Sequence, residues 1–592
     1  MVQRVDVLIC GSGSAGLCAA LWLARSGINF KILDKRSERM TRGQADGVQC
    51  RTVEIFESFG VAEDLLRDAY HVLEVVFWES NGKGSITRTG RTADTAPGIS
   101  HQPHVILNQA RLNGILLDLM ARSNGQDVEY GYEVKEVRID SAKTSTKDEY
   151  PVTVTTEKDG KTEIFEAKYV LGCDGAHSTV RRSLGYKMIG DSTDAVWGVM
   201  DIYPRTNFPD IRKKALLYSD HGNLLIIPRE GGSLVRFYVK LPDGRIAKNV
   251  KLEDVHDTAR RIFQGYDMEF ADTYWWSAYS IGQRLVDHFS KDDRVFLTGD
   301  ACHTHAPKAG QGMNVSLQDG YNIGWKLAAV LNGRASPDLL KTYSLERQKV
   351  ASDLIDFDRN FMKLFSQEVK HEDQTNANLV VRQFVATGPF TAGITAKYND
   401  SEITFAARSK PDLAVNLHVG MRFPSAQVVR LCDARAMQLQ RALPSDGRWR
   451  LVIFAGDIRD LNSAKKLDSL AKFLSSQKGL VQKFTREGDD IDSFIDPVVV
   501  LHGARAEIEQ EHIPSYFQPV TSPWGVRDLH KIFIDDESYN SGHGKAYEAY
   551  GVDVQKGALA IVRPDQYISM VISLEDYDEI DRFFNGFARP QN

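Results

Sequence analysis

Apolar and polar positions along the chain follow patterns that predict alternating strands and helices. The first, largely apolar run, 5–9, enters the glycine-containing turn Gly11–Gly16, and a helix-forming run leaves it. A second apolar run, Phe30–Leu33, ends at the acidic residue Asp34. A strand, a glycine-rich turn, a helix and a second strand with an acidic end are together typical of a dinucleotide-binding unit. A chance turn before an ordinary helix is the less favoured interpretation, because both halves of the fingerprint are present.

Each glycine of this turn has its own physical role. Gly11 permits the tight turn, Gly13 lets the backbone approach the phosphates, and Gly16 lets the helix pack closely on the strand. Asp34 is placed where an acidic side chain can bind the ribose hydroxyls. The turn therefore predicts a bound ADP moiety, and it leaves open which dinucleotide carries that moiety.

The remaining pattern divides the chain into segments of different character. Short strand-like runs between about 195 and 279 predict an inserted antiparallel sheet. Glycine and proline interrupt regular structure between 385 and 425, which indicates a linker, and strands alternate with helices beyond it. The expected organisation is a discontinuous Rossmann-type domain at 1–190 and 285–385, an antiparallel-sheet domain at 191–284, a linker with an extended segment at 386–445, and a compact α/β domain at 446–592.

Composition excludes several classes of protein. The chain has 592 residues and a formal net charge of -6, which gives no electrostatic case for nucleic-acid binding. Its six cysteines are scattered without a CxxC pair, which argues against a disulfide framework, a zinc site or a redox motif. No apolar run approaches membrane-spanning length, and the first strand begins too early to leave room for a signal peptide. We therefore expect a soluble cytoplasmic protein without a membrane partner.

Two further motifs bear on the identity of the dinucleotide. The stretch Cys173–Ser178, which contains Asp174, repeats the theme of a strand followed by glycine. A later buried run leads to Gly299–Ala301 and then to Gly310–Asn314. A nicotinamide dehydrogenase needs only the first turn. All three motifs in this order resemble the single-component FAD-dependent aromatic hydroxylases, the class typified by 4-hydroxybenzoate 3-monooxygenase.

Other segments are similar to one branch of that class. The stretches 43–52, 226–230, 234–239 and 561–567 look like the phenol 2-monooxygenase and 3-hydroxybenzoate 4-monooxygenase branch. Proteins of that branch carry an extra C-terminal domain with a thioredoxin-like fold and no redox cysteines, and the absence of CxxC here agrees with it. The fold implied is α/β: a Rossmann-type FAD-binding domain with an inserted antiparallel-sheet substrate domain, followed by a C-terminal thioredoxin-like domain.

The resemblance also implies cofactors and partners. It implies tightly but non-covalently bound FAD, NADPH as co-substrate, O2, a small phenolic substrate and a homodimer. The helix after Gly312 would present its positive N-terminal end to the reduced, anionic flavin. The positions carried over as FAD-binding are Gly11, Gly13, Ser14, Ala15, Gly16, Asp34, Lys35, Gln44, Gln109, Asp174, Gly299, Asp300, Pro307, Gly310, Gly312, Met313 and Asn314.

The implied reaction inserts one oxygen atom of O2 into a phenolic ring through a flavin C4a-hydroperoxide. Electrophilic attack is faster on a phenolate, so the site needs a group that takes or polarises the phenol proton. Asp46 and Tyr238 are the candidates that match the family motifs, and Asp46 in an apolar pocket would have a raised pKa and could act as a base. Arg229 matches an arginine near substrate and flavin, where it could stabilise negative charge. Without the resemblance, a turn residue, a strand aromatic and a surface charge would be the simpler interpretations.

Several alternatives stay open. The product is expected to be of the catechol type, and phenol, resorcinol and 3-hydroxybenzoate are all possible substrates, since a benzoate would need a buried cation. The chain could instead be another flavin enzyme of the same fold, such as an epoxidase, a halogenase or a ring-cleaving monooxygenase, or a non-catalytic flavin-fold protein. His303 and His305 suggest a metal pair, but no third ligand is apparent, so we interpret them as packing beside the flavin. No metal site is expected.

Overall fold

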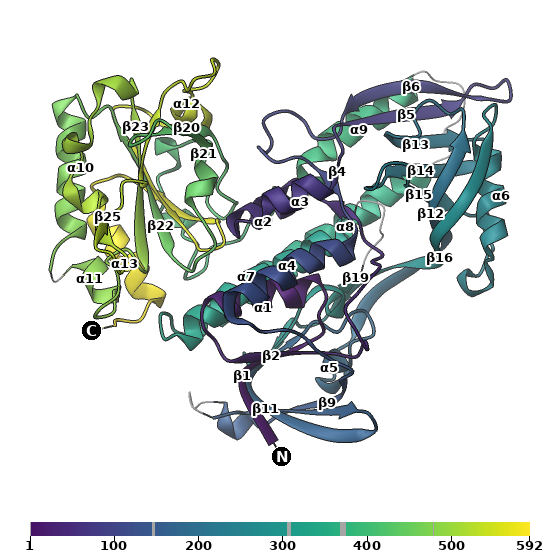
Figure 1. Ribbon diagram of the computed structural model, residues 1–592, viewed down its shortest axis with the longest axis horizontal. Helices are drawn as coiled ribbons and strands as arrows, with labels where there is room; N and C mark the ends of the chain where they lie inside the picture. Colours follow the sequence, from purple (N-terminus) through teal and green to yellow (C-terminus); the bar gives the residue numbers. More distant parts are fainter. Residues whose placement is uncertain (1, 145–148, 305–309, 367–374, 478, 592) are drawn as a thin grey trace.

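The computed structural model describes residues 2–144, 149–304, 310–366, 375–477 and 479–591. The chain forms three regions, each built on its own large sheet, and the long helices α7 (Gly312–Leu331) and α8 (Lys341–Ser366) run between them (Figure 1). The C-terminal region, green to yellow in Figure 1, lies against α2 (Cys50–Ser58) and α7. The predicted α/β class is confirmed.

The N-terminal region contains the parallel core that the first glycine turn predicts. β1 pairs in parallel with β2 on one side and with β11 on the other. α1 (Ser14–Arg25) starts directly after the turn and packs on α7. The two helices touch at Gly320, where a Cβ would overlap the carbonyl oxygen of Ala15. In spatial order the strands are β17 (Ser290–Lys291), β18 (Val295–Leu297), β11 (Lys161–Gly172), β1 (Val2–Cys10), β2 (Phe30–Asp34) and β8 (Glu129–Tyr130), with β10 (Val152–Lys158) and β9 (Glu133–Ile139) continuing from β11.

Further helices surround this sheet. α4 (Gln109–Asn124) packs on α1, and the side chain of Asn108 caps its first turn by accepting a hydrogen bond from the amide of Ala110. α3 (Ala62–Asp68) follows α2, and α5 (Thr179–Ser183) follows β11. A small antiparallel sheet of β3 (Gly47–Val48), β7 (Val105–Ile106) and β4 (Tyr70–His71) continues from the segment that carries Asp46.

The second sheet differs from the expected insertion in two respects. It includes β5 and β6, which come from the segment 1–190, whereas the sequence predicts that this whole segment belongs to the first domain. β5 also pairs in parallel with β13, so the sheet is not purely antiparallel. The sequence pattern of a strand does not show which distant strand will pair with it at the edge of the sheet. This explains both differences. The spatial order is β19 (His303–Thr304), β16 (Met268–Val286), β12 (Met188–Thr206), β15 (Val235–Lys240), β14 (Gly222–Pro228), β13 (Lys214–Ser219), β5 (Glu74–Ser80) and β6 (Ile86–Ala93).

Two helices accompany the second sheet. α6 (Leu252–Ile262) packs its apolar face, which includes Val255 and Ile262, on the sheet. α9 (Thr375–Thr391) contacts β6, and the ring of Phe384 lies edge-on to Phe77 of β5 at a centroid distance of 5.8 Å.

The C-terminal region contains a mixed sheet in which β22, β23 and β26 run parallel and β27 and β28 form an antiparallel pair. α10 (Leu461–Leu474) packs on β22, and α11 (Leu480–Phe484), α12 (Ala546–Tyr550) and α13 (Tyr577–Phe587) belong to the same region. The thioredoxin-like assignment stays a prediction. The order is β21 (Ala436–Gln438), β20 (Gln427–Arg430), β26 (Ile532–Asp535), β23 (Ile495–His502), β22 (Trp449–Gly456), β27 (Ala558–Val562) and β28 (Ile568–Ile572), and a separate hairpin joins β24 (Val520–Thr521) to β25 (Val526–Arg527).

The segment 386–445 is not a free linker. Its backbone pairs with the C-terminal region: the amides of Phe405 and Lys410 donate to the carbonyls of Ser569 and Val571, and β20 joins the sheet. Glycines and prolines broke the local pattern there, but long-range hydrogen bonds hold the backbone in place. This correction makes the C-terminal region longer than 446–592.

Two sequence expectations concern the chain as a whole. All six cysteines have free thiols. Within the ranges described above, no helix is both long enough and apolar enough to cross a lipid bilayer.

Candidate functional site

A large cavity lies between the first and the second sheet. Its empty space is about 1360 Å³, counting the open mouth. The structure brings many of the predicted positions together around it. Those that line the cavity are Gly13, Ser14, Ala15, Gln44, Asp46, Gln109, Tyr238, Gly299, Asp300, Gly310, Gly312 and Met313.

The N-termini of two helices face this cavity. α1 begins at Ser14 and α7 begins at Gly312, and both first turns are among the lining residues. Unpaired backbone amides at a helix N-terminus bind anions such as phosphate. A Cβ added at Gly13 would meet no atom within 4 Å, so the backbone there is open to a ligand. The cavity therefore fits a long, anionic dinucleotide such as FAD.

Other predicted positions shape the cavity from behind. Gly11 has a φ of 108°, and a Cβ there would overlap the carbonyl oxygen of Cys173, so only glycine fits. A Cβ at Gly16 would overlap the carbonyl oxygen of Gly11. The side chain of Asn314 accepts a hydrogen bond from the amide of Gln49 at 3.0 Å and donates to the carbonyl of Gly47 at 2.9 Å.

Asp34 lies at the end of β2, as predicted, with its carboxylate already hydrogen-bonded. It accepts from the amide and hydroxyl of Ser12, each at 2.8 Å, and from the guanidinium of Arg36 at 2.7 Å. Burial by itself raises the pKa of Asp34, but these hydrogen bonds outweigh it and lower the pKa to about 2. Lys35 is exposed, so Arg36 and not Lys35 contacts the carboxylate. A ribose-binding role of Asp34 stays a prediction.

Asp174 has a structural function, and its contact with FAD stays a prediction. Its Oδ2 accepts from the amides of Thr179 and Val180, at 2.7 and 3.1 Å, and so caps α5. Its other carboxylate oxygen, Oδ1, is buried and has no hydrogen-bond partner among the described residues. Pro307 and His305 lie outside the described residues.

The surroundings of Asp46 differ from the apolar pocket that the sequence suggested. The Asp46 carboxylate is buried, and its Oδ2 lies 3.3 Å from the Arg236 guanidinium and 3.7 Å from that of Arg229. Arg236 also donates to the carbonyl of Gln44 and to both oxygens of Asp201. Burial lowers the pKa of the Arg236 guanidinium, but Asp46 and the other neighbouring groups outweigh it and hold that pKa well above its usual value. Asp46 thus belongs to a buried ionic cluster and not to the apolar pocket that the sequence suggested.

Arg229 occupies a position behind the cavity wall. It pairs with Asp201 at 2.8 Å and with Glu230 at 2.9 Å, and it is almost fully buried. It is not among the residues that line the cavity. The expected contact with substrate and flavin is therefore replaced by a position from which Arg229 supports Asp46.

Tyr238 lies where two cavities meet. It lines the large cavity and also a second, mostly apolar pocket of about 760 Å³. Burial and the nearby Asp46 carboxylate raise the pKa of Tyr238 to about 12. Its neighbour Tyr279 also lines the large cavity, and the Tyr279 hydroxyl is buried without a hydrogen-bond partner among the described residues. Tyr238 thus belongs to the walls of both cavities, and Tyr279 belongs to the wall of the large cavity.

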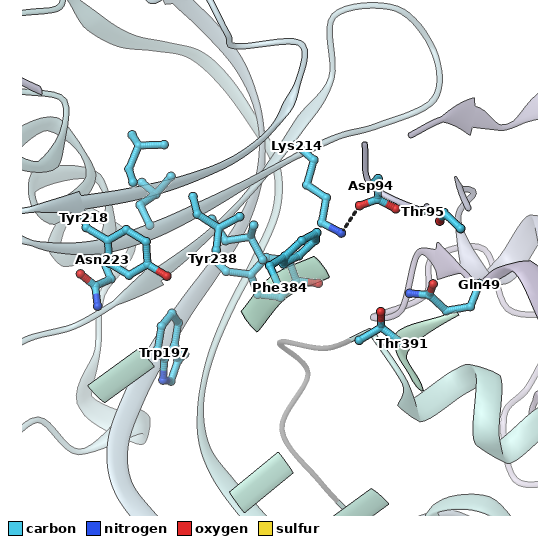
Figure 2. A pocket seen from close by; sticks show the side chains of 14 residues that line it. Gln49, Asp94, Thr95, Trp197, Lys214, Tyr218, Asn223, Tyr238, Phe384 and Thr391 are labelled. Carbon is cyan, nitrogen blue, oxygen red and sulfur yellow. Dashed lines mark hydrogen bonds and ion pairs between the residues drawn. The ribbon is translucent and has the colours of Figure 1, made fainter. Parts of the chain in front are cut away.

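The apolar pocket contains a charged group (Figure 2). The Lys214 ammonium pairs there with the Asp94 carboxylate and lies 5.2 Å from the ring centroid of Phe384. Asp94 also lies 2.8 Å from Nδ1 of the buried His104. Besides these groups the wall contains Trp197, Leu216, Leu217, Leu224 and Leu225.

Sequence reasoning missed several of these residues. Arg236 and Tyr238 are two positions apart on one strand, so their side chains lie on the same face. The charge of Arg236 at this spacing from the candidate Tyr238 could have indicated Arg236 from the sequence. Lys214, Asp94 and His104 come from separate strands and loops, and no local pattern joins them. Their convergence depends on the parallel pairing of β5 with β13.

His303 lies in a buried group with Cys302 and Asp319, whose ligand atoms are close enough together to hold a metal ion, so the third ligand that was not apparent from the sequence is present. The His303 Nε2 lies 2.8 Å from Oδ2 of Asp319, and Cys302 is close by. Asp319 also accepts from the amide of Gly299 at 2.9 Å and from Arg347 at 2.6 Å. The carboxylate oxygens of Asp319 are engaged in holding the Gly299 turn, and the interpretation of His303 as packing beside the flavin stays a prediction.

Known proteins resemble the chain along its whole length. The family described as FAD binding domain matches residues 4–358, and the family described as phenol hydroxylase, C-terminal dimerisation domain, matches residues 396–592. The FAD-dependent monooxygenase terD of Aspergillus terreus is 55% identical over 100% of this chain and 97% of its own length. The 3-hydroxybenzoate 4-monooxygenase of Comamonas testosteroni is 43% identical over 99% of this chain and 95% of its own length. The phenol 2-monooxygenase fsqG of Aspergillus fumigatus is 37% identical over 99% of this chain and 96% of its own length.

Solved structures share the fold. The flavin-dependent monooxygenase PieE in complex with FAD and substrate has a TM-score of 0.70 at 19% identity, covering 98% of this chain and 99% of its own. A ternary complex of aklavinone-11 hydroxylase with FAD and aklavinone has a TM-score of 0.69 at 19% identity, covering 99% of both chains.

Proposed function

The chain belongs to the FAD-dependent monooxygenases that carry a phenol hydroxylase-type C-terminal dimerisation domain, and we propose that it hydroxylates a simple phenolic ring with NADPH and O2. In the balanced reaction, one oxygen atom of O2 enters the ring and the other leaves as water. NADPH supplies a hydride and solvent supplies one proton net, and the ring hydrogen that the oxygen displaces is retained in the new hydroxyl or in the water, so that ArH, O2, NADPH and H+ give ArOH, H2O and NADP+. The observation that carries this proposal is the meeting of Asp46 and Tyr238 with two helix N-termini in one cavity that adjoins an apolar pocket.

FAD, when bound, accepts electrons from NADPH and activates O2. The residues that would hold it are those at the two helix N-termini and at the Gly299 turn. Gly13 and Ser14 would approach the pyrophosphate, since they open the first turn of α1. Asp300 and Met313 line the same cavity.

The polar groups at the cavity junction would control the substrate proton. Asp46 would accept a hydrogen bond from the phenolic hydroxyl, and the guanidinium of Arg236 beside it would favour negative charge on the substrate oxygen. Because the pKa of Tyr238 is raised to about 12, its hydroxyl keeps its proton near neutral pH and would donate to that oxygen. The apolar wall would hold the ring and exclude water.

The substrate class follows from the cation in the apolar pocket. Phenol has no anionic group that Lys214 could bind, whereas a hydroxybenzoate has a carboxylate. The Lys214 ammonium carries three N–H donors, so it can donate to a substrate carboxylate and to Asp94 at the same time. A similar protein, 43% identical, is named 3-hydroxybenzoate 4-monooxygenase. We therefore favour 3-hydroxybenzoate over phenol among the simple hydroxyarenes.

Comparing wild type with Lys214→Met tests this choice. Steady-state NADPH oxidation and product formation would be measured with phenol, resorcinol and 3-hydroxybenzoate. Losing a hydrogen bond to a charged group should raise KM for 3-hydroxybenzoate by about 10- to 100-fold and leave KM for phenol nearly unchanged. Lys213→Met is the matched control, because the Lys213 ammonium pairs with Glu74 at 2.9 Å and does not line the pocket. A wild type that prefers phenol, or equal losses for all substrates, would contradict an acid-bearing substrate.

We also propose that the protein is a homodimer that associates through its C-terminal region, as the family description suggests. An apolar group on the hairpin of β24 and β25 supports this: Trp524 is 86% exposed, Val520 60% and Val526 59%. An exposed tryptophan among valines is the kind of anchor on which interfaces depend. Sedimentation velocity should find a dimer for wild type and for Tyr539→Ala, whose aromatic ring is exposed outside the hairpin, and monomers for Trp524→Ala. A monomeric wild type, or an unaffected Trp524→Ala dimer, would refute this assignment.

A further inference from the structure

A turn of the C-terminal region is buried against the flavin-binding region. Residues 563–567 join β27 to β28, and Arg563, Asp565 and Gln566 are at most 1% exposed. Gln566 has a φ of 67°, a left-handed backbone conformation that side chains other than glycine rarely adopt. Such a conformation persists where the surroundings over-determine it.

One chain of contacts leads from this turn to the segment that carries Asp46. The Gln566 side-chain oxygen accepts from the Arg51 guanidinium at 2.9 Å, and the Asp565 carbonyl accepts from the same guanidinium at 2.9 Å. Arg51 lies in the first turn of α2, five residues beyond Asp46. Gln49, just before α2, lines the apolar pocket. The turn therefore holds the start of α2 and, through it, one wall of both cavities.

A second chain of contacts leads to the Gly299 turn on the opposite wall. The Tyr567 ring stacks on Tyr398 at a centroid distance of 4.4 Å, and the Tyr398 hydroxyl accepts from Arg347 at 3.2 Å. Arg347 donates to Asp319 at 2.6 Å, and Asp319 accepts from the amide of Gly299 at 2.9 Å. Both chains are buried from end to end.

The turn itself is fixed by ion pairs to the long helices. Arg563 makes two hydrogen bonds to the Glu346 carboxylate of α8, at 2.6 and 3.0 Å. The Asp565 carboxylate accepts from the indole N–H of Trp325 on α7 at 3.0 Å. The backbone of the turn is thus held independently of the Gln566 side chain, so removing that side chain alone need not displace the turn.

We propose that the turn 563–567 is a positioning element of the active site, and that Gln566 and Arg51 are the positioning residues through which the C-terminal region holds the Asp46 segment. The part of this inference that concerns hydroxylation rests on the proposed function. It assigns the C-terminal region a role in the geometry of the site that is separate from association between subunits.

Gln566→Gly is the most direct test. Glycine adopts a φ of 67° without strain, so the variant relieves the backbone and loses the side-chain hydrogen bonds to Arg51 and to the Leu443 carbonyl. Ala434→Gly is the matched control, because Ala434 has a φ of 60° on an exposed turn of the same region and contacts neither chain. Gln566→Asn should restore part of the effect, since asparagine tolerates the left-handed conformation and keeps an amide. If Gln566→Gly fails to fold, Arg51→Lys is the second variant. Lysine keeps the positive charge beside Glu54 but loses the paired hydrogen bonds from the guanidinium to Gln566 and to the Asp565 carbonyl.

Hydrogen–deuterium exchange, measured in the FAD-loaded and the FAD-free protein, tests the effect of these variants without any substrate. We expect Gln566→Gly to raise exchange several-fold in peptides covering 44–51, with unchanged sedimentation, and to weaken FAD binding less than tenfold. Exchange in 298–301 should change little, because Tyr567 is kept. With the preferred hydroxyarene, the product formed per NADPH should fall at least twofold. Unchanged exchange at 44–51, or the same change in Ala434→Gly, would overturn the proposal. A wild type that hydroxylates no phenol would refute the proposed function. The exchange result would still decide whether the turn 563–567 positions the Asp46 segment.

Discussion

Asp46 shows how a matched motif can identify a residue while its environment follows from distant parts of the chain. The motif placed Asp46 at the cavity wall, where the structure has it. The guanidiniums of Arg229 and Arg236 beside it come from strands nearly two hundred residues later. Its carboxylate therefore acts within a cluster of charges, and its geometry depends on those ion pairs.

Asp46→Asn should separate chemistry from cofactor binding. The amide keeps the shape of the side chain but accepts a hydrogen bond more weakly, so kcat for hydroxylation should fall by about 10²- to 10⁴-fold. FAD affinity, followed by flavin fluorescence, should change by less than about threefold, because the substitution leaves both helix N-termini unchanged. Equal losses of both quantities would mean that Asp46 is structural.

The raised pKa of Tyr238 predicts a specific pH dependence. A pKa raised to about 12 means that the protonated, donating form persists through the working range and is lost only in strong alkali. Tyr238→Phe should therefore lower kcat/KM by roughly 10²-fold, by a constant factor between about pH 6 and pH 10. A basic limb of the wild-type profile that disappears in Tyr238→Phe would show instead that Tyr238 titrates in that range.

Residues within a motif were predictable because their roles are local. Gly11 and Gly16 act on atoms of neighbouring turns, so spacing alone indicates them, whereas Asn314 was indicated by the family resemblance. Lys214 and His104 have no such signal, because their meeting depends on which strands pair.

At the scale of elements, the close crossing of α1 and α7 is central to the site. Both helices begin at the cavity, and Gly320 allows α7 to approach Ala15 in the first turn of α1. The positions of both N-termini are therefore set by one contact between backbones.

Gly320→Ala should disturb that contact. The added methyl overlaps the Ala15 carbonyl, so the helices must move apart, at a cost of about 1–3 kcal/mol in the free energy of unfolding and with weaker FAD binding. Gly586→Ala is the control, since its Cβ would meet no atom within 4 Å and should stabilise the protein by about 0.5–1 kcal/mol. Thermal unfolding and FAD titration measure both effects. A Gly320→Ala protein as stable as wild type would mean that the crossing tolerates a side chain.

The elements that sequence reasoning misplaced share one cause. β5 and β6 join the second sheet, and the segment 386–445 joins the C-terminal region, through hydrogen bonds to partners far away in the chain. Local patterns indicated the strands of 1–190 and the breaks of 386–445, but pairing between distant edges decides which region each belongs to.

At the scale of the whole molecule, buried contacts join the flavin-binding and C-terminal regions into one unit. Trp325 of α7 lies edge-on to Trp449 of β22 at 5.9 Å, and the main apolar core extends across this boundary. Arg51, Glu346 and Arg563 add buried ion pairs there.

Calorimetry of the FAD-free protein should therefore record one cooperative unfolding transition. Separating the regions would break the buried ion pair between Glu346 and Arg563 and expose the apolar core that crosses the boundary, so neither region is expected to stay folded alone. Two well-resolved transitions would contradict this.

The central claim, hydroxylation of a phenolic ring, is tested most directly with isotopically labelled oxygen. FAD-loaded protein would be incubated with NADPH, 3-hydroxybenzoate and ¹⁸O2, and the product analysed by mass spectrometry. We predict a dihydroxybenzoate that carries one ¹⁸O atom, formed in proportion to the NADPH consumed. NADPH oxidation that yields only hydrogen peroxide with every hydroxyarene tested, or a product whose new oxygen comes from water, would contradict the account.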